Sequence, residues 1–486
     1  MSQQTNKEAV AAVQKEVEGL KSKLIAMADK VWTLAELSLQ EEESATYLIG
    51  ILEKNEFNIG SVGTSNIPTA FTASYGSGSP VIGIMTEYDA LPDLGNEPVA
   101  EKTPRTDGKT TGHGCGHNLI GTGGIGAAIA LKNWMKKENI PGTIRVFGAA
   151  AEEAEGAKIY MARDGVYDNL DACLHWHPAM VTTPWNSRST AVNMLNIEFH
   201  GKSSHAGIAP WLGRSALHAA ELFAHGIALM REHLEPTART HYVYTNGGVA
   251  PNVVVDYASI KLFVRDVDRK HVEATTEWVK QMAEGAAMAT QTTSKALVFC
   301  GMHDLVPNKP LADRLYEHTA QIGLPEYTDE EIEFAKKCQV AYGVEPTGMP
   351  KEVTPPKYPV PTMGGSTDVA EVSWITPTMG LMGQTIPEGC MVHTWQATAC
   401  HGMSIGHKGL MMSTKAIASL GADLFTDTDL LAAAKADFKE RVGDYVFKSP
   451  LDPEMKQPLG LKGIHINLHE GHDVHLHEVA KHVTKK

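Results

Sequence analysis

The stretch Gly142-Thr-Ile-Arg-Val-Phe-Gly-Ala-Ala-Ala-Glu-Glu153 is an apolar run that ends in two adjacent acids. A second apolar run, Val81–Asp89, also ends in acids. Such runs are typical of strands that are buried on both faces of a parallel sheet. Ligands of open α/β sheets bind where the carboxyl ends of the strands meet. The two runs therefore predict an α/β fold with a binding site at that edge of the sheet.

The side-by-side carboxylates of Glu152 and Glu153 indicate metal-assisted chemistry. On an extended backbone, adjacent side chains point to opposite sides, so one carboxylate can bind a metal while the other reaches a water. The preceding motif Gly112-His-Gly-Cys-Gly-His-Asn118 contains Cys115 and His117, which are ligands that zinc and similar divalent metals accept. An isolated Cys or His is more often a buried core residue, but this context favours ligands. The residues predict a metal-assisted hydrolase.

Composition limits the other classes of function. The chain has 486 residues, of which 43% are hydrophobic, and this length favours two domains. A net charge of −14 argues against a nucleic acid or an anionic membrane as partner, so we expect a small substrate. Residues 1–30 are interpreted as an amphipathic helix without a signal segment, and a cytoplasmic location with reduced cysteines is expected.

Strands and helices alternate along the chain. Outside the two opening runs, the pattern predicts a helix at Leu119–Trp134, a strand at Ala172–Trp176, and helices at Asp329–Ala341 and His407–Phe425. Between residues 190 and 301 the order changes to strand, helix, strand, strand, helix, strand. These elements are expected at Met194–Phe199, Ser215–His233, Tyr242–Thr245, Ala258–Val264, Val272–Ala287 and Ala296–Cys300. This βαββαβ order is that of the ferredoxin-like unit.

The pattern therefore predicts an inserted domain. We expect a catalytic α/β domain built from residues 1–189 and 302–462, with the insertion at 190–301. A His-rich tail follows at 463–486. The tail could collect metal or could be a solvated end of the chain, and it is not assigned to the active site.

A series of short motifs extends over nearly the whole chain. They are Trp32–Ser38, Glu87–Pro92, Gly114–Asn118, Ala151–Glu153, His177–Pro178, Ser204–Ala206, Pro251–Val253, Ser366–Val369, Val392–Gln396 and Ile405–Lys408. In their order and spacing the chain resembles the metallo-aminoacylase and carboxypeptidase family, which includes auxin-conjugate amidohydrolases. The resemblance implies a dinuclear-metal, aminopeptidase-like catalytic domain. It also implies that the inserted ferredoxin-like α+β domain serves as a lid and dimerisation domain.

The resemblance also implies roles for individual residues. The metal ligands would be Cys115, His117, Glu153, His177 and His393. Glu152 would be the general base. His175 and His177 flank Trp176, and strand alternation places both on one face, so periodicity cannot choose between them; the resemblance favours His177. His401 and His407 are near His393 in the sequence, but they do not stand at the position that matches the family's last metal ligand.

Four further residues complete the implied site. Asp89 would orient a metal ligand, although it could instead cap a strand end. His205 would polarise the scissile carbonyl in a neighbouring subunit. Asn252 and Arg265 would hold the substrate's carbonyl and carboxylate. The alternative for Arg265 is an ion pair with Asp266 or Asp268 on the strand surface.

The implied reaction is hydrolysis of an N-acyl or aryl-acyl amino acid, such as p-aminobenzoyl-glutamate, to p-aminobenzoate and glutamate. It would use two divalent metal ions, manganese or zinc. The broader alternatives are another N-acyl-amino-acid hydrolase or a dipeptidase. A third alternative is a non-catalytic subunit that completes a partner's site. The role of His205 implies a homodimer, and the resemblance also allows a heteromer with a homologous A subunit. Relatives often carry Asp where this chain has Asn118, so their metal preference is not transferred.

Overall fold

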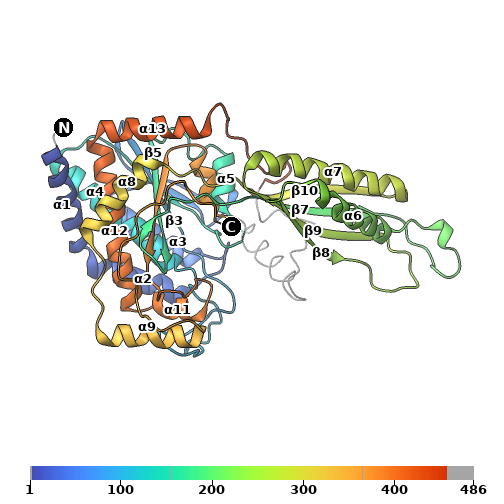
Figure 1. The fold of residues 1–486 in the computed structure, drawn as a ribbon, viewed down its shortest axis with the longest axis horizontal. Coiled ribbons are helices and arrows are strands. Elements are labelled where there is room, and N and C mark those ends of the chain that lie inside the picture. Colours follow the sequence, from blue (N-terminus) through green and yellow to red (C-terminus); the bar gives the residue numbers. More distant parts are fainter. Residues whose placement is uncertain (1–2, 155, 364, 457–486) are drawn as a thin grey trace. The chain divides into compact units, whose positions relative to one another are not determined.

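The computed structural model describes residues 3–154, 156–363 and 365–456, which form two compact units (Figure 1). The first unit contains the described residues up to Arg188 together with Val306–Pro361 and Val372–Phe447. The second contains Ser189–Leu305, Thr362–Glu371 and the described residues from Lys448. The expected His-rich tail at 463–486 lies outside the described residues.

A seven-stranded mixed sheet forms the centre of the first unit, with the strand order β1-β2-β4-β3-β5-β11-β6. The strands are β1 Asn58–Val62, β2 Phe71–Ser77, β3 Val81–Thr86, β4 Gly142–Gly148, β5 Ala172–Ala179, β6 Thr183–Pro184 and β11 Thr378–Gln384. The four inner strands β4, β3, β5 and β11 run parallel to one another, and the outer pairings are antiparallel. The predicted α/β class is confirmed, and the two opening apolar runs form adjacent parallel strands.

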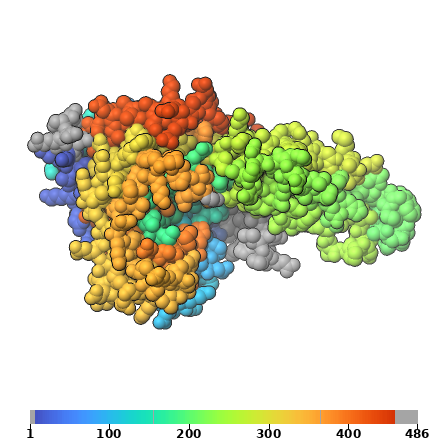
Figure 2. Space-filling model, viewed as in Figure 1, coloured from blue at the N-terminus to red at the C-terminus, as the bar shows by residue number. Residues whose placement is uncertain are grey.

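Helices surround this sheet, some in contact with the strands and others with neighbouring helices. They are α1 Gln3–Gly19, α2 Lys21–Leu34, α3 Glu42–Lys54, α4 His117–Glu138, α5 Ala157–Arg163, α8 Lys309–Ile322, α9 Asp329–Tyr342, α11 Trp395–His401, α12 Ser404–Thr426 and α13 Thr428–Val442, with the 3-10 turn η1 Thr64–Asn66. Helices α4 and α12 contact the strands, and α1 packs on both helices (Figure 1). The segment Val306–Pro361, yellow to orange in Figure 2, covers much of the visible face of this unit.

The N-terminal prediction of one helix is wrong. Two helices, α1 and α2, meet at Leu20, just after Gly19 ends the first. A break at a single glycine leaves the amphipathic pattern of either side intact, so periodicity does not reveal it. The turn allows α2 to bury Leu24 and Val31 in contact with α4.

The second unit is a four-stranded antiparallel sheet with two long helices. Its elements are β7 Ala191–His200, α6 Ala216–Met230, β8 Arg239–Asn246, β9 Tyr257–Asp266, α7 Arg269–Thr290 and β10 Thr293–Met302, with the 3-10 turns η2 Pro210–Leu212 and η3 Arg231–His233. The strand order β10-β7-β9-β8 is that of the predicted ferredoxin-like unit. The short helix α10, Val369–Ser373, is divided between the two units.

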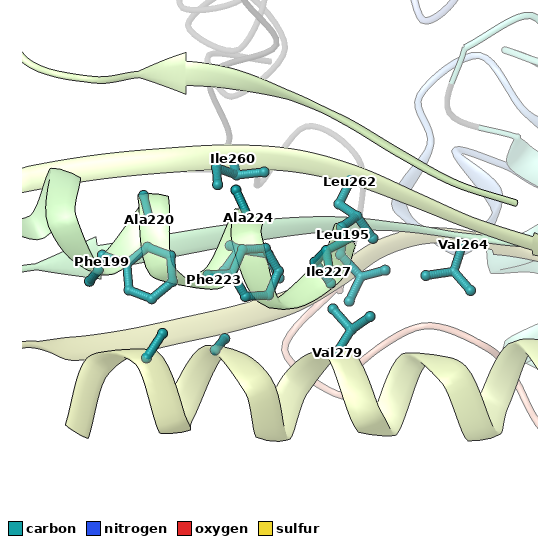
Figure 3. Close-up of a cluster of buried hydrophobic side chains, with 14 of the residues drawn as sticks. Leu195, Phe199, Ala220, Phe223, Ala224, Ile227, Ile260, Leu262, Val264 and Val279 are labelled. Atoms are coloured by element: carbon teal, nitrogen blue, oxygen red, sulfur yellow. The ribbon is translucent and has the colours of Figure 1, made fainter. Parts of the chain in front are cut away.

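Apolar side chains on one face of the strands form the core of this second unit together with the two helices. Phe199 of β7 and Ile260 and Leu262 of β9 are buried with Phe223 of α6 and Val279 of α7 (Figure 3). One face of each strand is therefore apolar and packs on the helices, which explains why the period-two pattern predicts these elements well.

The two ends of the inserted segment lie side by side. Strands β7 and β10 are hydrogen-bonded neighbours, with Val192 opposite Met302. Beyond them, the backbone N–H of Leu305 donates to Ser189 Oγ over 2.9 Å. The segment Ser189–Leu305 therefore begins and ends at one place.

Candidate metal centre

Cys115 and His117 lie where a tight turn leads into helix α4. Gly116 between them has φ +78°, in the left-handed region. A Cβ on Gly116 would lie 2.7 Å from Pro178 Cγ and 2.8 Å from His401 Cε1, so only glycine fits. The turn buries both the thiol of Cys115 and the imidazole of His117.

Glu152 and Glu153 do not lie on an extended strand, which corrects the expectation from side-chain alternation. Strand β4 ends at Gly148, Ala151 has φ +55°, and the two acids follow in a turn. The turn brings both carboxylates to one cluster. Glu152 Oε2 lies 3.9 Å and Glu153 Oε1 lies 3.7 Å from His117 Nε2.

The five predicted ligands come together as two groups of donor atoms that share one thiol. Cys115, His117 and His177 form the first group, and Cys115, Glu153 and His393 form the second; within each group the donor atoms lie within 4.8 Å of one another. Cys115 Sγ is 3.3 Å from His177 Nε2, and Glu153 Oε2 is 3.2 Å from His393 Nε2. A shared Sγ would let one thiolate serve two neighbouring cations.

Buried atoms without partners show that the residues fit cations. Among the described residues, His117 Nε2 and Glu153 Oε1 have no hydrogen-bond partner. His117 Nδ1 lies 2.7 Å from Asp89 Oδ1 and donates its proton there, so Nε2 is the ring nitrogen that can bind a cation. Thiolate, imidazole and carboxylate donors together suit zinc and similar divalent metals. Leaving such buried donors unpaired would otherwise be costly.

The electrostatics of the cluster favour added positive charge. Burial, reinforced by Glu153, raises the pKa of the Cys115 thiol well above its usual value, so the thiolate form needs nearby cations. Burial opposes protonation of His117, but Asp89 and Cys115 outweigh it and raise the pKa of His117. Despite burial, His117 and hydrogen bonds lower the pKa of Asp89 to about 2.

Asp89 does more than cap the end of a strand. Its Oδ1 accepts from His117, and its Oδ2 accepts from the backbone N–H of Glu153 over 3.0 Å and from Ser38 Oγ over 2.8 Å. One buried carboxylate therefore orients a candidate ligand from each donor group.

The geometry distinguishes the two histidines of β5. His177 faces Cys115 with Nε2, while its Nδ1 lies 2.7 Å from the carbonyl oxygen of Pro178. His175 lies opposite Gly380 of β11, where an added Cβ would approach its Nε2 to 2.3 Å. Burial lowers the pKa of His175 to about 3. Of the two, His177 alone joins a donor group in the described part of the chain.

The other nearby histidines are engaged elsewhere. His401 lies within hydrogen-bond distance of the carbonyl of His113 and of Thr385 Oγ1. His407 Nε2 lies 2.7 Å from Asp29 Oδ1 in α2. Among the described residues, neither histidine belongs to a donor group. This agrees with their sequence positions, which do not match that of the family's last metal ligand.

Three buried charged groups at the cluster were not assigned from sequence. Glu87 follows β3 and pairs with the fully buried Lys158 of α5, with 2.7 Å between Oε1 and Nζ. Glu41 accepts from the backbone N–H of Ala151, and burial together with Asp89 raises its pKa to about 8. The position of Glu87 at the strand end was the available signal. Nothing in the local sequence marks Lys158 or Glu41.

His205 and Asn252 are neighbours in the second unit. His205 forms an isolated bridge with Val253, and the N–H of Ala206 donates to the carbonyl of Asn252. The side chain of His205 is exposed, and its Nδ1 accepts from two backbone N–H groups, those of Gly207 and Ile208, each over 3.2 Å. Nε2 therefore carries the ring proton and can donate to a substrate oxygen.

Arg265 lies near the end of strand β9, half buried. Its guanidinium donates to Ser366 Oγ over 3.2 Å, and no ion pair with Asp266 or Asp268 is present among the described residues. Asp266 instead accepts from Thr237, and Asp268 caps α7. At about 3.4 Å per residue, the strand from Tyr257 to Arg265 spans roughly 27 Å. Arg265 is therefore far from His205 and Asn252 within one chain.

Comparison with known proteins identifies the family. The model of peptidase family M20/M25/M40 matches residues 83–338. The chain belongs to the M20/M25/M40 peptidase family. The resemblance drawn from the motifs is thereby confirmed, and the chain is a metal-dependent hydrolase of amide bonds that uses divalent metal ions.

Individual M20 relatives agree with this assignment. The chain is 34% identical over 473 residues to the B subunit of p-aminobenzoyl-glutamate hydrolase from Escherichia coli, covering 92% of this chain and 98% of the relative. The chain is 27% identical to the Xaa-Arg dipeptidase of Mus musculus, over 86% of this chain and 89% of that protein.

A solved structure of the same family shares the fold. A dinuclear metal binding peptidase of the M20 family from Bacillus subtilis superposes with a TM-score of 0.55 at 18% identity, covering 83% of this chain and 98% of that one. Within the residues described here, no helix is both long and apolar enough to cross a membrane.

Proposed function

We propose that the chain hydrolyses p-aminobenzoyl-glutamate to p-aminobenzoate and glutamate with two divalent cations, manganese or zinc. Cys115, His117 and His177 would hold one cation, and Cys115, Glu153 and His393 the other. The observation that carries this proposal is the single thiol shared by two donor groups. The substrate is supported by the 34% identity to the Escherichia coli hydrolase subunit over 98% of its length.

Glu152 is the proposed general base. Bound divalent cations would lower the pKa of water and polarise the amide carbonyl. Glu152 belongs to neither of the two ligand groups, and its side chain is 15% exposed against 7% for Glu153. A carboxylate so placed can accept the proton of the attacking water and deliver it to the leaving nitrogen.

The second unit supplies the proposed contacts to substrate. The Nε2–H of His205 would donate to the oxygen that becomes negative as the amide carbon turns tetrahedral. Asn252 lies beside it and would donate to the substrate carbonyl. Arg265 is desolvated, and its hydroxyl partner Ser366 is neutral, so its guanidinium is available to clamp a substrate carboxylate with two hydrogen bonds.

The length of β9 supports a dimer. A substrate of this class is much shorter than the roughly 27 Å between the ends of that strand. If His205 and Arg265 both bind one substrate, they therefore come from two chains. The surface beside His205 exposes Ile208, Trp211 and Leu212 to 69%, 70% and 57%, as expected of a face that a second copy covers. We propose a homodimer in which the inserted unit acts as lid and dimerisation domain. Because the Escherichia coli relative is a B subunit, a heteromer with a homologous A subunit is the alternative.

Glutamate release from p-aminobenzoyl-glutamate tests the proposal. The purified chain, loaded with manganese or zinc, is compared with Glu152→Gln at equal bound metal. We expect release by the wild type and a loss of about 10² to 10⁴-fold in the variant. Equal release by both would contradict the assignment of the base.

The same assay separates the alternatives. The dipeptidase relative makes Xaa-Arg dipeptides the second substrate class to test. Cleavage of these dipeptides, without release from p-aminobenzoyl-glutamate, would replace the proposed substrate. Metal-loaded protein that cleaves neither would point to a subunit that needs a partner.

A further inference from the structure

Glu87 and Lys158 form a buried ion pair beside the donor groups. The carboxylate of Glu87 is 6% exposed and the ammonium of Lys158 is fully buried, with Oε1 and Nζ 2.7 Å apart. A buried ion pair often stabilises a fold no better than two apolar side chains would. Its place beside the donor groups therefore calls for a functional explanation.

The second oxygen of Glu87 faces His117. Glu87 Oε2 lies 3.5 Å from His117 Nε2, which has no hydrogen-bond partner among the described residues. His117 donates its Nδ1 proton to Asp89, so a cation that binds at Nε2 takes the place of any proton there. Glu87 Oε2 and the Nε2 lone pair would then face the same cation.

The separation of these atoms suits a shared cation. Nitrogen and oxygen ligands bind zinc at about 2.0–2.2 Å, so two of them at a tetrahedral angle lie about 3.4 Å apart. The 3.5 Å between Glu87 Oε2 and His117 Nε2 agrees with this distance. Glu87, His117 and Glu152 also form a third group of donor atoms that lie within 4.8 Å of one another.

We propose that Glu87 is a further ligand of the cation bound by His117, and that Lys158 positions it. Lys158 holds Oε1 and thereby directs Oε2 at the cation. Lys158 also offsets the extra negative charge that a further carboxylate brings to the centre. This inference rests on the proposed two-cation centre.

Zinc binding to the full chain tests the proposal without an activity readout. The variant Glu87→Gln keeps the shape of the side chain and an oxygen for Lys158, but it places an uncharged amide at the cation. We expect one zinc ion to bind as in the wild type and the other at least ten-fold more weakly, measured by competition with a chelator. Glu56→Gln is the matched control, because it removes a carboxylate that faces the buried Lys132 away from the centre.

A double variant guards against an effect of misfolding. Glu87→Met with Lys158→Met removes both buried charges at once, a change that folds commonly tolerate. The metal-free double variant should melt near the wild-type temperature and still lose tight binding of one zinc ion.

The outcomes distinguish this inference from the function proposed above. Wild-type affinity for both zinc ions in both variants would overturn the role of Glu87 and leave the ion pair purely structural. Fewer than two zinc ions on the wild type would instead refute the two-cation centre, and the role of Glu87 with it.

Discussion

Two inactive variants of this chain should restore activity when they share a dimer. Glu152→Gln removes the proposed base from the first unit, and His205→Ala removes the proposed carbonyl donor from the second. The strand that separates Arg265 from His205 is too long for both residues of one chain to reach one substrate. A mixed dimer therefore contains one centre with both lesions and one centre with neither.

The size of the recovery follows from the pairing. Equal amounts of the two variants, reassorted at random, place half of the chains in mixed dimers, and each mixed dimer has one intact centre of two. We expect about a quarter of wild-type glutamate release per chain. Co-expression with two affinity tags and purification through both tags isolates the mixed dimers. These dimers should release glutamate at about half of the wild-type rate per chain.

A second mixture provides the control. Glu152→Gln combined with Cys115→Ser puts one lesion in each centre of the mixed dimer, since both residues belong to the first unit. That mixture should show no recovery. If Glu152→Gln and His205→Ala together release no more glutamate than the two variants measured separately, His205 serves its own chain or no centre at all, and the argument from strand length is refuted.

Three further changes test other parts of the site. Asp89→Asn should weaken zinc binding about 10 to 100-fold, because an amide holds His117 and the Glu153 backbone less well than a carboxylate, and unchanged affinity in a chelator competition would contradict this role. Arg265→Lys should raise KM with kcat largely retained, because one ammonium cannot form the two-point clamp on the substrate carboxylate; an unchanged KM would remove Arg265 from the substrate site. Glu41 has a folded pKa of about 8, above its usual 4.5, so the stability it contributes is full below pH 4.5 and is lost as pH rises to about 8. Metal-free Glu41→Gln should therefore gain stability relative to the wild type over that interval, by up to about 1.4 kcal/mol per pH unit, in thermal melts at pH 5, 7 and 9, whereas a pH-independent difference would contradict the buried-acid assignment.

Local patterns explain what could be predicted from the sequence. The six strands and helices predicted for the second unit were each placed within a few residues of their observed ends. Cys115 and His117 stand in a distinctive motif, and Glu153 and His393 were recognised by resemblance. By contrast, β1, β2 and α8 were not predicted.

Long-range contacts explain what was missed. The difference between His175 and His177 depends on Gly380, a residue of another strand whose missing side chain leaves room for one imidazole. Lys158 lies in an apolar helix, and its partner is far away in sequence. The orientation of Glu152 depends on the left-handed backbone of Ala151, which no side-chain pattern reveals.

The hydrogen bond between Leu305 and Ser189 has a consequence for how this protein can change over evolution. Because the inserted segment leaves and returns at one point, the sheet that carries the donor groups requires only a short closure there, whatever the length of chain beyond it. The inserted segment could change in length, be replaced or acquire different surface residues without displacing β5 or β11. Chemistry and assembly are thus encoded in separable stretches of chain, and one catalytic framework can acquire new partners and substrates by altering the stretch that contains no candidate metal ligand.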